Sequence, residues 1–201
     1  MYSLNLRTPW PRPRLRCPAF LAALASTLAL LWAPSFLNAA EASVLLEYKV
    51  KAGYLFNFAK FVEWPEATLP GTRSPIVIGV MDGAEALPVL QQQLQGKSVN
   101  EHPLQVKVVA NAVSAVGCHI LFVSRSAGQS VAEVRRAVGT NAVLLVGETD
   151  QFAERGGAIG FVREQESFRV HLNLVAATQA GLKVSARLSS VAKLVRTKPE
   201  D

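Results

Sequence analysis

The sequence predicts an α/β fold, a three-layer αβα sandwich with a mostly parallel sheet and an antiparallel edge hairpin. Short β-branched runs without polar alternation, typical of strands covered on both faces, alternate with amphipathic segments of helical period. Near the C-terminus two neighbouring runs have period two instead, which is typical of a hairpin. Strands that alternate with helices form mostly parallel sheets with helices on both faces.

The first forty residues do not fit this pattern and indicate a signal peptide. A basic start without acidic residues precedes an uninterrupted apolar run from Ala19 to Ala33, which Pro34 breaks. We expect cleavage so that the mature chain begins at Ala40 or Glu41. The alternative is an uncleaved membrane anchor, but the apolar run is shorter than the roughly 20 residues that span a bilayer. The sequence therefore predicts export to the periplasm.

The mature part is expected to be one domain, residues 41–196, followed by a frayed tail at 197–201. Without the four arginines of the leader it carries 17 basic and 15 acidic side chains, which gives no electrostatic reason to expect nucleic acid as a partner. Cys118 is its only thiol, so no internal disulfide can form. A domain of this size can bury roughly 70% of its unfolded surface and be stable without one.

The first element of the mature chain is an amphipathic helix over residues 45–62. Apolar side chains recur there every three or four residues, while Glu47, Lys51 and Asn57 fall elsewhere on the helical wheel. The Trp64-Pro65 pair ends it, because a residue before proline is disfavoured in a helix.

Strands and helices then alternate along the chain. We expect strands at 76–81, 104–109, 118–123 and 143–146, and helices at 84–94 and 130–138. Asp150 can cap a short helix to Arg155, which Gly156 and Gly157 terminate. The hairpin comprises residues 158–163 and 168–174, and a last amphipathic helix covers 185–195.

Motifs of enzymes, cofactor sites and metal sites are missing. The chain has no glycine fingerprint for nucleotides, no phosphate loop and no serine hydrolase elbow. His102, His119 and His171 lie in separate segments without metal-ligand spacing, which favours structural roles. Cys118 and His119 are adjacent in a strand and so point to opposite faces, which disfavours a nucleophile with its base. We therefore expect no enzyme, cofactor or metal, and a buried, apolar role for Cys118.

Several segments together resemble the YfiR-like family of periplasmic regulatory proteins. They are 54–65 (YLFNFAKFVEWP), 118–124 (CHILFVS), 152–161 (FAERGGAIGF), 168–174 (FRVHLNL) and 180–185 (AGLKVS). The resemblance extends from about residue 46 to 195. It implies a periplasmic repressor that holds a membrane-bound diguanylate cyclase inactive by binding its periplasmic domain, so that release raises cyclic di-GMP and promotes biofilm formation.

The resemblance also implies a homodimer and redox control through disulfides, and here the sequence departs from the family pattern. Residues 152–161 contain no cysteine pair, and Cys118 has no partner within the chain. Cys118 is thus the one candidate redox thiol. It could form only an intermolecular disulfide, and its apolar neighbours argue against the access that this requires.

The hairpin is the expected partner-binding surface. If Phe168, Val170, Leu172 and Leu174 pack inward, Arg169, His171 and Asn173 face outward. We expect at least one large apolar group to be exposed, and we hypothesise that Ile159, Phe161 and His171 contact the partner. The alternative is that Ile159 and Phe161 belong to the core, as apolar strand residues usually do.

Two classes of function remain open. The first is an interaction protein that restrains a membrane-bound diguanylate cyclase or sensor kinase by favouring its inactive conformation. The second is a small-molecule binding protein that feeds a sensor or transporter. Ligands of such sheets bind beyond the carboxyl ends of the strands, which points to Asp82, Ser124 and Glu148. Turn and cap roles are the alternative for these three residues.

Overall fold

The computed structural model describes residues 34–71, 73–165 and 167–198. The chain divides into two compact units, residues 1–42 and 43–201, and the second contains the fold discussed below. The expected signal peptide lies mostly outside the described residues and remains a prediction. Within the described residues, no helix combines the length and apolar character needed to cross a bilayer.

An eight-stranded sheet forms the centre of the domain, in the order β10-β8-β7-β6-β5-β2-β4-β3. Its strands are β2 (Ile76–Met81), β3 (Ser98–Val99), β4 (His102–Val109), β5 (Ile120–Val123), β6 (Leu144–Gly147), β7 (Ile159–Glu164), β8 (Ser167–Leu172) and β10 (Lys193–Leu194). The central strands, in the spatial order β4-β2-β5-β6-β7, are parallel. Strands β7 and β8 form the antiparallel hairpin. The two-residue strand β10 pairs in parallel outside β8. The predicted fold class is confirmed.

Alternation along the strands separates two apolar cores, one on each face of the sheet. In β5, for example, Ile120 and Phe122 lie in one core, while Leu121 and Val123 lie in the other. This is the consequence of a side-chain period of two in a strand that is covered on both faces.

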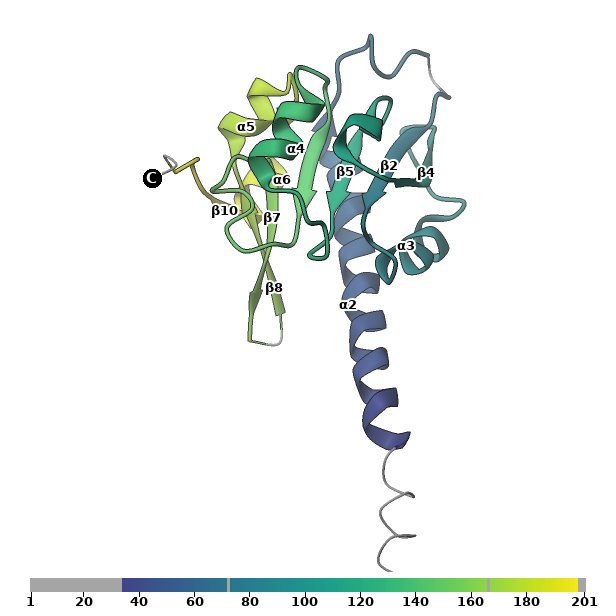
Figure 1. Ribbon diagram of the computed structural model, residues 1–201. Coiled ribbons are helices and arrows are strands. Elements are labelled where there is room, and N and C mark those ends of the chain that lie inside the picture. Colours follow the sequence, from purple (N-terminus) through teal and green to yellow (C-terminus); the bar gives the residue numbers. More distant parts are fainter. Residues whose placement is uncertain (1–33, 72, 166, 199–201) are drawn as a thin grey trace, which may run out of the picture. The chain divides into compact units, whose positions relative to one another are not determined.

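Different helices cover the two faces, as Figure 1 shows. The first core receives side chains from α2 (Pro34–Phe61), α3 (Ala86–Leu94), α5 (Leu174–Gln179) and α6 (Ala186–Val191). The second receives them from α4 (Val131–Val138) and the short 3-10 helix η1 (Ala112–Ala115). A separate two-stranded sheet joins β1 (Val62–Glu63), at the end of α2, to β9 (Lys183–Val184).

Two predicted helices are corrected by the structure. Residues 150–155 form successive turns instead of a helix, because Gln151 has a left-handed backbone with φ 56° that interrupts helical geometry. The last helix ends at Val191, four residues earlier than predicted. Ala192 is extended there, and the next two residues pair with β8 as strand β10.

Candidate functional site

A hollow of about 590 Å³ lies at the carboxyl ends of β2, β5 and β6. Asp82, Ser124 and Glu148, which directly follow these three strands, all line it, and Tyr48 of α2 lines it from the helix. Within the sheet, β2 lies between β4 and β5. The strands that follow β2 in sequence are first added on one side of it, at β3 and β4, and then on the other side, from β5 onward. Such a reversal of strand order is where open α/β sheets bind ligands. We call this the switch-point hollow.

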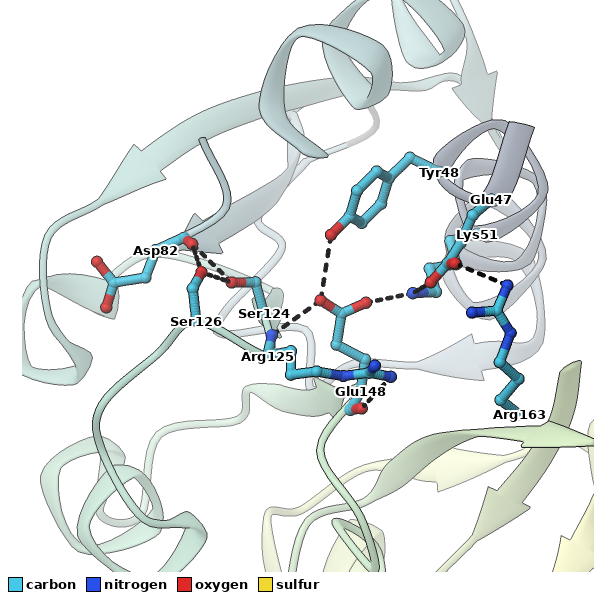
Figure 2. Close-up of polar contacts among 9 residues, drawn as sticks. All are labelled: Glu47, Tyr48, Lys51, Asp82, Ser124, Arg125, Ser126, Glu148 and Arg163. Carbon is cyan, nitrogen blue, oxygen red and sulfur yellow. Dashed lines mark hydrogen bonds and ion pairs between the residues drawn. The ribbon is translucent and has the colours of Figure 1, made fainter. Parts of the chain in front are cut away.

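A buried ion pair between Lys51 and Glu148 lies beside this hollow. The two side chains are 0% and 3% exposed, and the Lys51 ammonium group donates to Oε2 of Glu148. A second carboxylate oxygen, Oε1 of Glu47, lies 2.5 Å from the same ammonium group. Figure 2 shows Lys51 reaching from α2 toward Glu148. The pair thus joins the helix to the end of the central strand β6.

The remaining oxygen of Glu148 has two further partners. Its Oε1 accepts hydrogen bonds from the Tyr48 hydroxyl at 3.3 Å and from the backbone N–H of Arg125 at 2.8 Å. Burial raises the pKa of Tyr48 above its ordinary value, and the charge of Glu148 raises it further. The hydroxyl therefore stays protonated and remains a donor to this carboxylate.

Aromatic rings enclose Lys51 and extend the network to the hairpin. Its ammonium nitrogen lies 4.9 Å from the ring centroid of Tyr48, 5.0 Å from that of Phe168 and 5.8 Å from that of Phe161. Arg163 of β7 pairs with Glu47 at 3.4 Å. Lys51 and its partners therefore connect α2, the end of β6 and the β7–β8 hairpin. Because an uncompensated buried charge is costly, removal of either charge from the buried pair should loosen this junction.

On the opposite wall of the hollow, hydroxyl groups hold the loop after β2. Ser124 donates to the backbone carbonyl of Asp82 at 2.6 Å, and Ser126 donates to the same oxygen. Asp82 itself has a left-handed backbone, with φ 51°. Its carboxylate is exposed and points away from Glu148 in Figure 2. Asp82 and Ser124 therefore have the turn roles considered as alternatives, although both also line the hollow.

The rim of the hollow presents charges of both signs. Asp82 and Glu85 contribute exposed carboxylates, and Arg125 and Arg163 contribute exposed guanidinium groups. The buried carboxylate of Glu148 is already engaged by its donors. The rim charges can attract a small solute with groups of both signs, and Glu148 itself cannot act as a general base because both of its oxygens already accept hydrogen bonds.

Sequence reasoning missed the part of this site that α2 provides. Lys51 was expected on the polar side of the helix, and that expectation is wrong because it is fully buried. The sequence did contain a signal for the burial of Lys51, in its neighbours on the same side of the helix. Glu47 lies one turn before Lys51, the spacing of an i, i+4 ion pair, and Tyr48 and Ala52 place the same side of the helix in the core.

The residues predicted to contact a partner lie in the interior. Ile159 is 0% exposed, Phe161 3% and His171 7%. Ile159 and Phe161 belong to the core that α2 covers, and Phe161 contacts the rings of Tyr54, Phe58 and Phe122. The hairpin was expected to expose at least one large apolar group; Ile159 and Phe161 are not exposed, whereas Val162 and Phe168 are partly exposed. The position of Ile159 and Phe161 agrees with the core alternative, and partner binding by this hairpin remains a prediction.

The outward face assigned to β8 is correct for Arg169 and wrong for His171 and Asn173. The turns at residues 149–157 cover that face. His171 Nδ1 lies 2.8 Å from Oε1 of Glu154, and Asn173 donates to the carbonyl of Ala153 at 2.8 Å. Asn173 also caps α5 by accepting from the N–H of Ala176. The predicted tail begins beside this cluster, since Thr197 accepts a hydrogen bond from Asn173.

His119 and Cys118 have buried positions away from the hollow. His119 Nδ1 accepts from the N–H of Val77 at 3.0 Å, so Nε2 carries the proton and donates to the carbonyl of Thr68 at 2.9 Å. Burial lowers the pKa of His119 and raises that of the Cys118 thiol. Among residues 34–198 that the structure describes, no group of three His, Cys, Asp or Glu side chains could hold a metal ion.

A comparison with protein families matches residues 48–193 to the YfiR/HmsC-like family, a span that includes almost all of the sheet, the hairpin and most of the hollow. The chain belongs to this family. The resemblance seen in the sequence is thereby confirmed. At the level of the family, YfiR/HmsC-like proteins are periplasmic regulators of diguanylate cyclases rather than enzymes. The comparison with curated proteins found no match.

Proposed function

We propose that this chain binds the periplasmic domain of a membrane-bound diguanylate cyclase and holds the cyclase inactive, so that its release raises cyclic di-GMP and favours biofilm formation. The family match over residues 48–193 carries this proposal. A restraint of this kind requires tighter binding to the inactive conformation than to the active one, because a ligand shifts an equilibrium only by its differential affinity.

We place the contact surface on the solvent side of α2 and the hairpin. Leu46 and Val50 are exposed, lie one turn apart on α2 and form an apolar stripe next to Glu47, which pairs with Arg163 of the hairpin. Phe168 is half-buried on the same hairpin. In this arrangement Ile159, Phe161 and His171 do not touch the partner. They support the contact surface from the interior, because they fix the hairpin against α2 and the turns at 149–157.

The test combines deletion of the gene with complementation. Deletion should raise cellular cyclic di-GMP, and the wild-type gene should restore it. Leu46→Glu/Val50→Glu should fail to restore the low level although the variant accumulates in folded form. The matched control is Val108→Glu/Val113→Glu, which also charges two exposed valines but near the opposite, β4 edge of the sheet. Unchanged cyclic di-GMP after deletion would exclude a cyclase as the partner.

A second candidate function is small-solute binding that feeds a sensor or transporter, and the switch-point hollow favours it. The rim charges would recognise a solute with groups of both signs. Thermal melting in the presence of individual periplasmic metabolites tests this function without any protein partner. A stabilising solute whose effect disappears in Arg125→Ala would support it, because ligand binding to the folded state raises the melting temperature. A panel without any stabilising solute would count against it.

A further inference from the structure

The C-terminal part of the domain is segregated in charge. From residue 167 to 198 the sequence contains six lysines and arginines and no aspartate or glutamate, although the mature chain as a whole is nearly balanced. All six are exposed: Arg169, Lys183, Arg187, Lys193, Arg196 and Lys198. Two acidic residues that contact this region are already engaged, Glu154 by His171 and Glu164 by Arg169. Glu164 therefore compensates Arg169, and the other five basic side chains have no acidic partner among the described residues.

Exposed apolar side chains lie among these basic groups. Val175, Val191 and Leu194 are 51%, 78% and 55% exposed. They come from α5, α6 and β10, which Figure 1 shows gathered at one side of the domain. Apolar side chains of this size gain free energy when they leave water, so exposed ones that lie beside basic groups favour an interaction surface.

Strand β10, at the edge of the sheet, contributes one basic and one apolar side chain. Lys193 lines one hollow, of about 630 Å³, together with Val191 and Arg169. Leu194 lines a second, of about 480 Å³, with Val175 and Arg196. Arg187 lies one helical turn before Val191 on α6. We refer to Val175, Arg187, Val191, Lys193, Leu194 and Arg196 as the basic edge.

We propose that the basic edge binds the surface of an anionic lipid membrane. Basic side chains attract anionic headgroups, while neighbouring apolar side chains enter the boundary between headgroups and acyl chains. The alternative occupant, a protein strand that extends the sheet, fits this edge less well. Strand β10 has only two residues, and an edge lysine such as Lys193 opposes strand pairing. Membrane binding would hold the protein beside a membrane-bound partner.

Co-sedimentation with lipid vesicles tests this proposal without any partner protein. The processed full-length chain is mixed with vesicles of phosphatidylethanolamine and phosphatidylglycerol, and with vesicles of phosphatidylcholine alone, at low and high salt. We expect binding to the anionic vesicles that weakens with salt, because exposed charges are screened. Each basic residue at an anionic surface contributes about fivefold to partitioning, so Lys193→Glu/Arg196→Glu should reduce binding at least about 25-fold.

The control carries the same change in charge at the opposite edge of the sheet. Lys97 precedes β3 and Lys107 lies in β4, so Lys97→Glu/Lys107→Glu should bind anionic vesicles like the wild type. Val191→Ser/Leu194→Ser should lose the binding that persists at high salt. Equal loss in both charge-reversal variants, or equal binding to neutral vesicles, would overturn the proposal. If the wild type does not bind vesicles, and Lys193→Glu/Arg196→Glu alone weakens the complex with the partner, the basic edge binds a protein and not a membrane.

Discussion

Replacement of Lys51 by methionine should destabilise the domain strongly. Methionine has an unbranched side chain of similar length and suits the surrounding rings of Tyr48, Phe161 and Phe168. The substitution therefore removes the charge with little change in packing. It leaves Glu148, which is 3% exposed, as a buried carboxylate without its cation.

The expected magnitude follows from that uncompensated charge. Breaking a buried ion pair by removing one partner typically costs about 3–5 kcal/mol. Glu148 keeps its hydrogen bonds from Tyr48 and Arg125, which favours the lower end, about 3 kcal/mol. For a domain of this size each kcal/mol lowers the melting temperature by about 2–4 °C, so Lys51→Met should melt about 6–12 °C lower.

Thermal melting of a double-mutant cycle checks the reasoning. Glu148→Gln keeps a carbonyl oxygen as acceptor but removes the charge, so Lys51→Met/Glu148→Gln should recover most of the stability lost in Lys51→Met. The matched control is Lys49→Met, because Lys49 is exposed on the same helix. If Lys51→Met melts within about 2 °C of the wild type, or if the two effects are additive, the buried pair does not stabilise the junction as described.

Three further predictions follow from other buried groups. Burial lowers the pKa of His119 below its ordinary value of about 6.5. Just below that pH, the unfolded chain therefore binds a proton at this histidine and the folded chain does not. Stability should therefore hold above about pH 6.5 and fall as the pH drops below it, and His119→Asn should show a weaker decline in melting temperature between about pH 7.5 and 5. A Cβ atom at Gly147 would lie 2.2 Å from the Phe152 ring, so Gly147→Ala should cost about 1–3 kcal/mol in urea unfolding, and a smaller residue at position 152 should relieve part of it. Burial raises the pKa of the Cys118 thiol, so a thiol reagent should modify Cys118 slowly in the folded protein and rapidly in denaturant. Rapid modification of the folded protein would contradict this and make Cys118 a candidate redox thiol again.

The sequence predicted the layers and most elements because local signals determine them. The β-branched run of β2 gave bounds that agree with the structure, and Ser130 caps α4 with Glu133 three residues later, as a capping box requires. The turns at 149–157 were missed because their form depends on distant packing. Gly147 and Gly157 leave room for the ring of Phe152, so Gly157 has a packing role instead of the helix-stopping role inferred for it.

The candidate site was predictable only in part, for a related reason. Chain order and the rule for carboxyl ends of parallel strands brought Asp82, Ser124 and Glu148 to one hollow. Neither rule shows which helix closes that hollow, so Lys51 and Tyr48 were missed. The faces of β8 were misassigned because a strand pattern does not reveal that the turns at 149–157 cover His171 and Asn173.

Direct reconstitution tests the proposed restraint most sharply. Membranes from the deletion strain are placed in nanodiscs, which leave both faces accessible, and conversion of GTP to cyclic di-GMP is measured as the purified processed chain is added. The proposal predicts a saturable fall in cyclase activity that Leu46→Glu/Val50→Glu does not produce and Val108→Glu/Val113→Glu does. Cyclase activity that stays constant at saturating concentrations of the wild-type chain would contradict it.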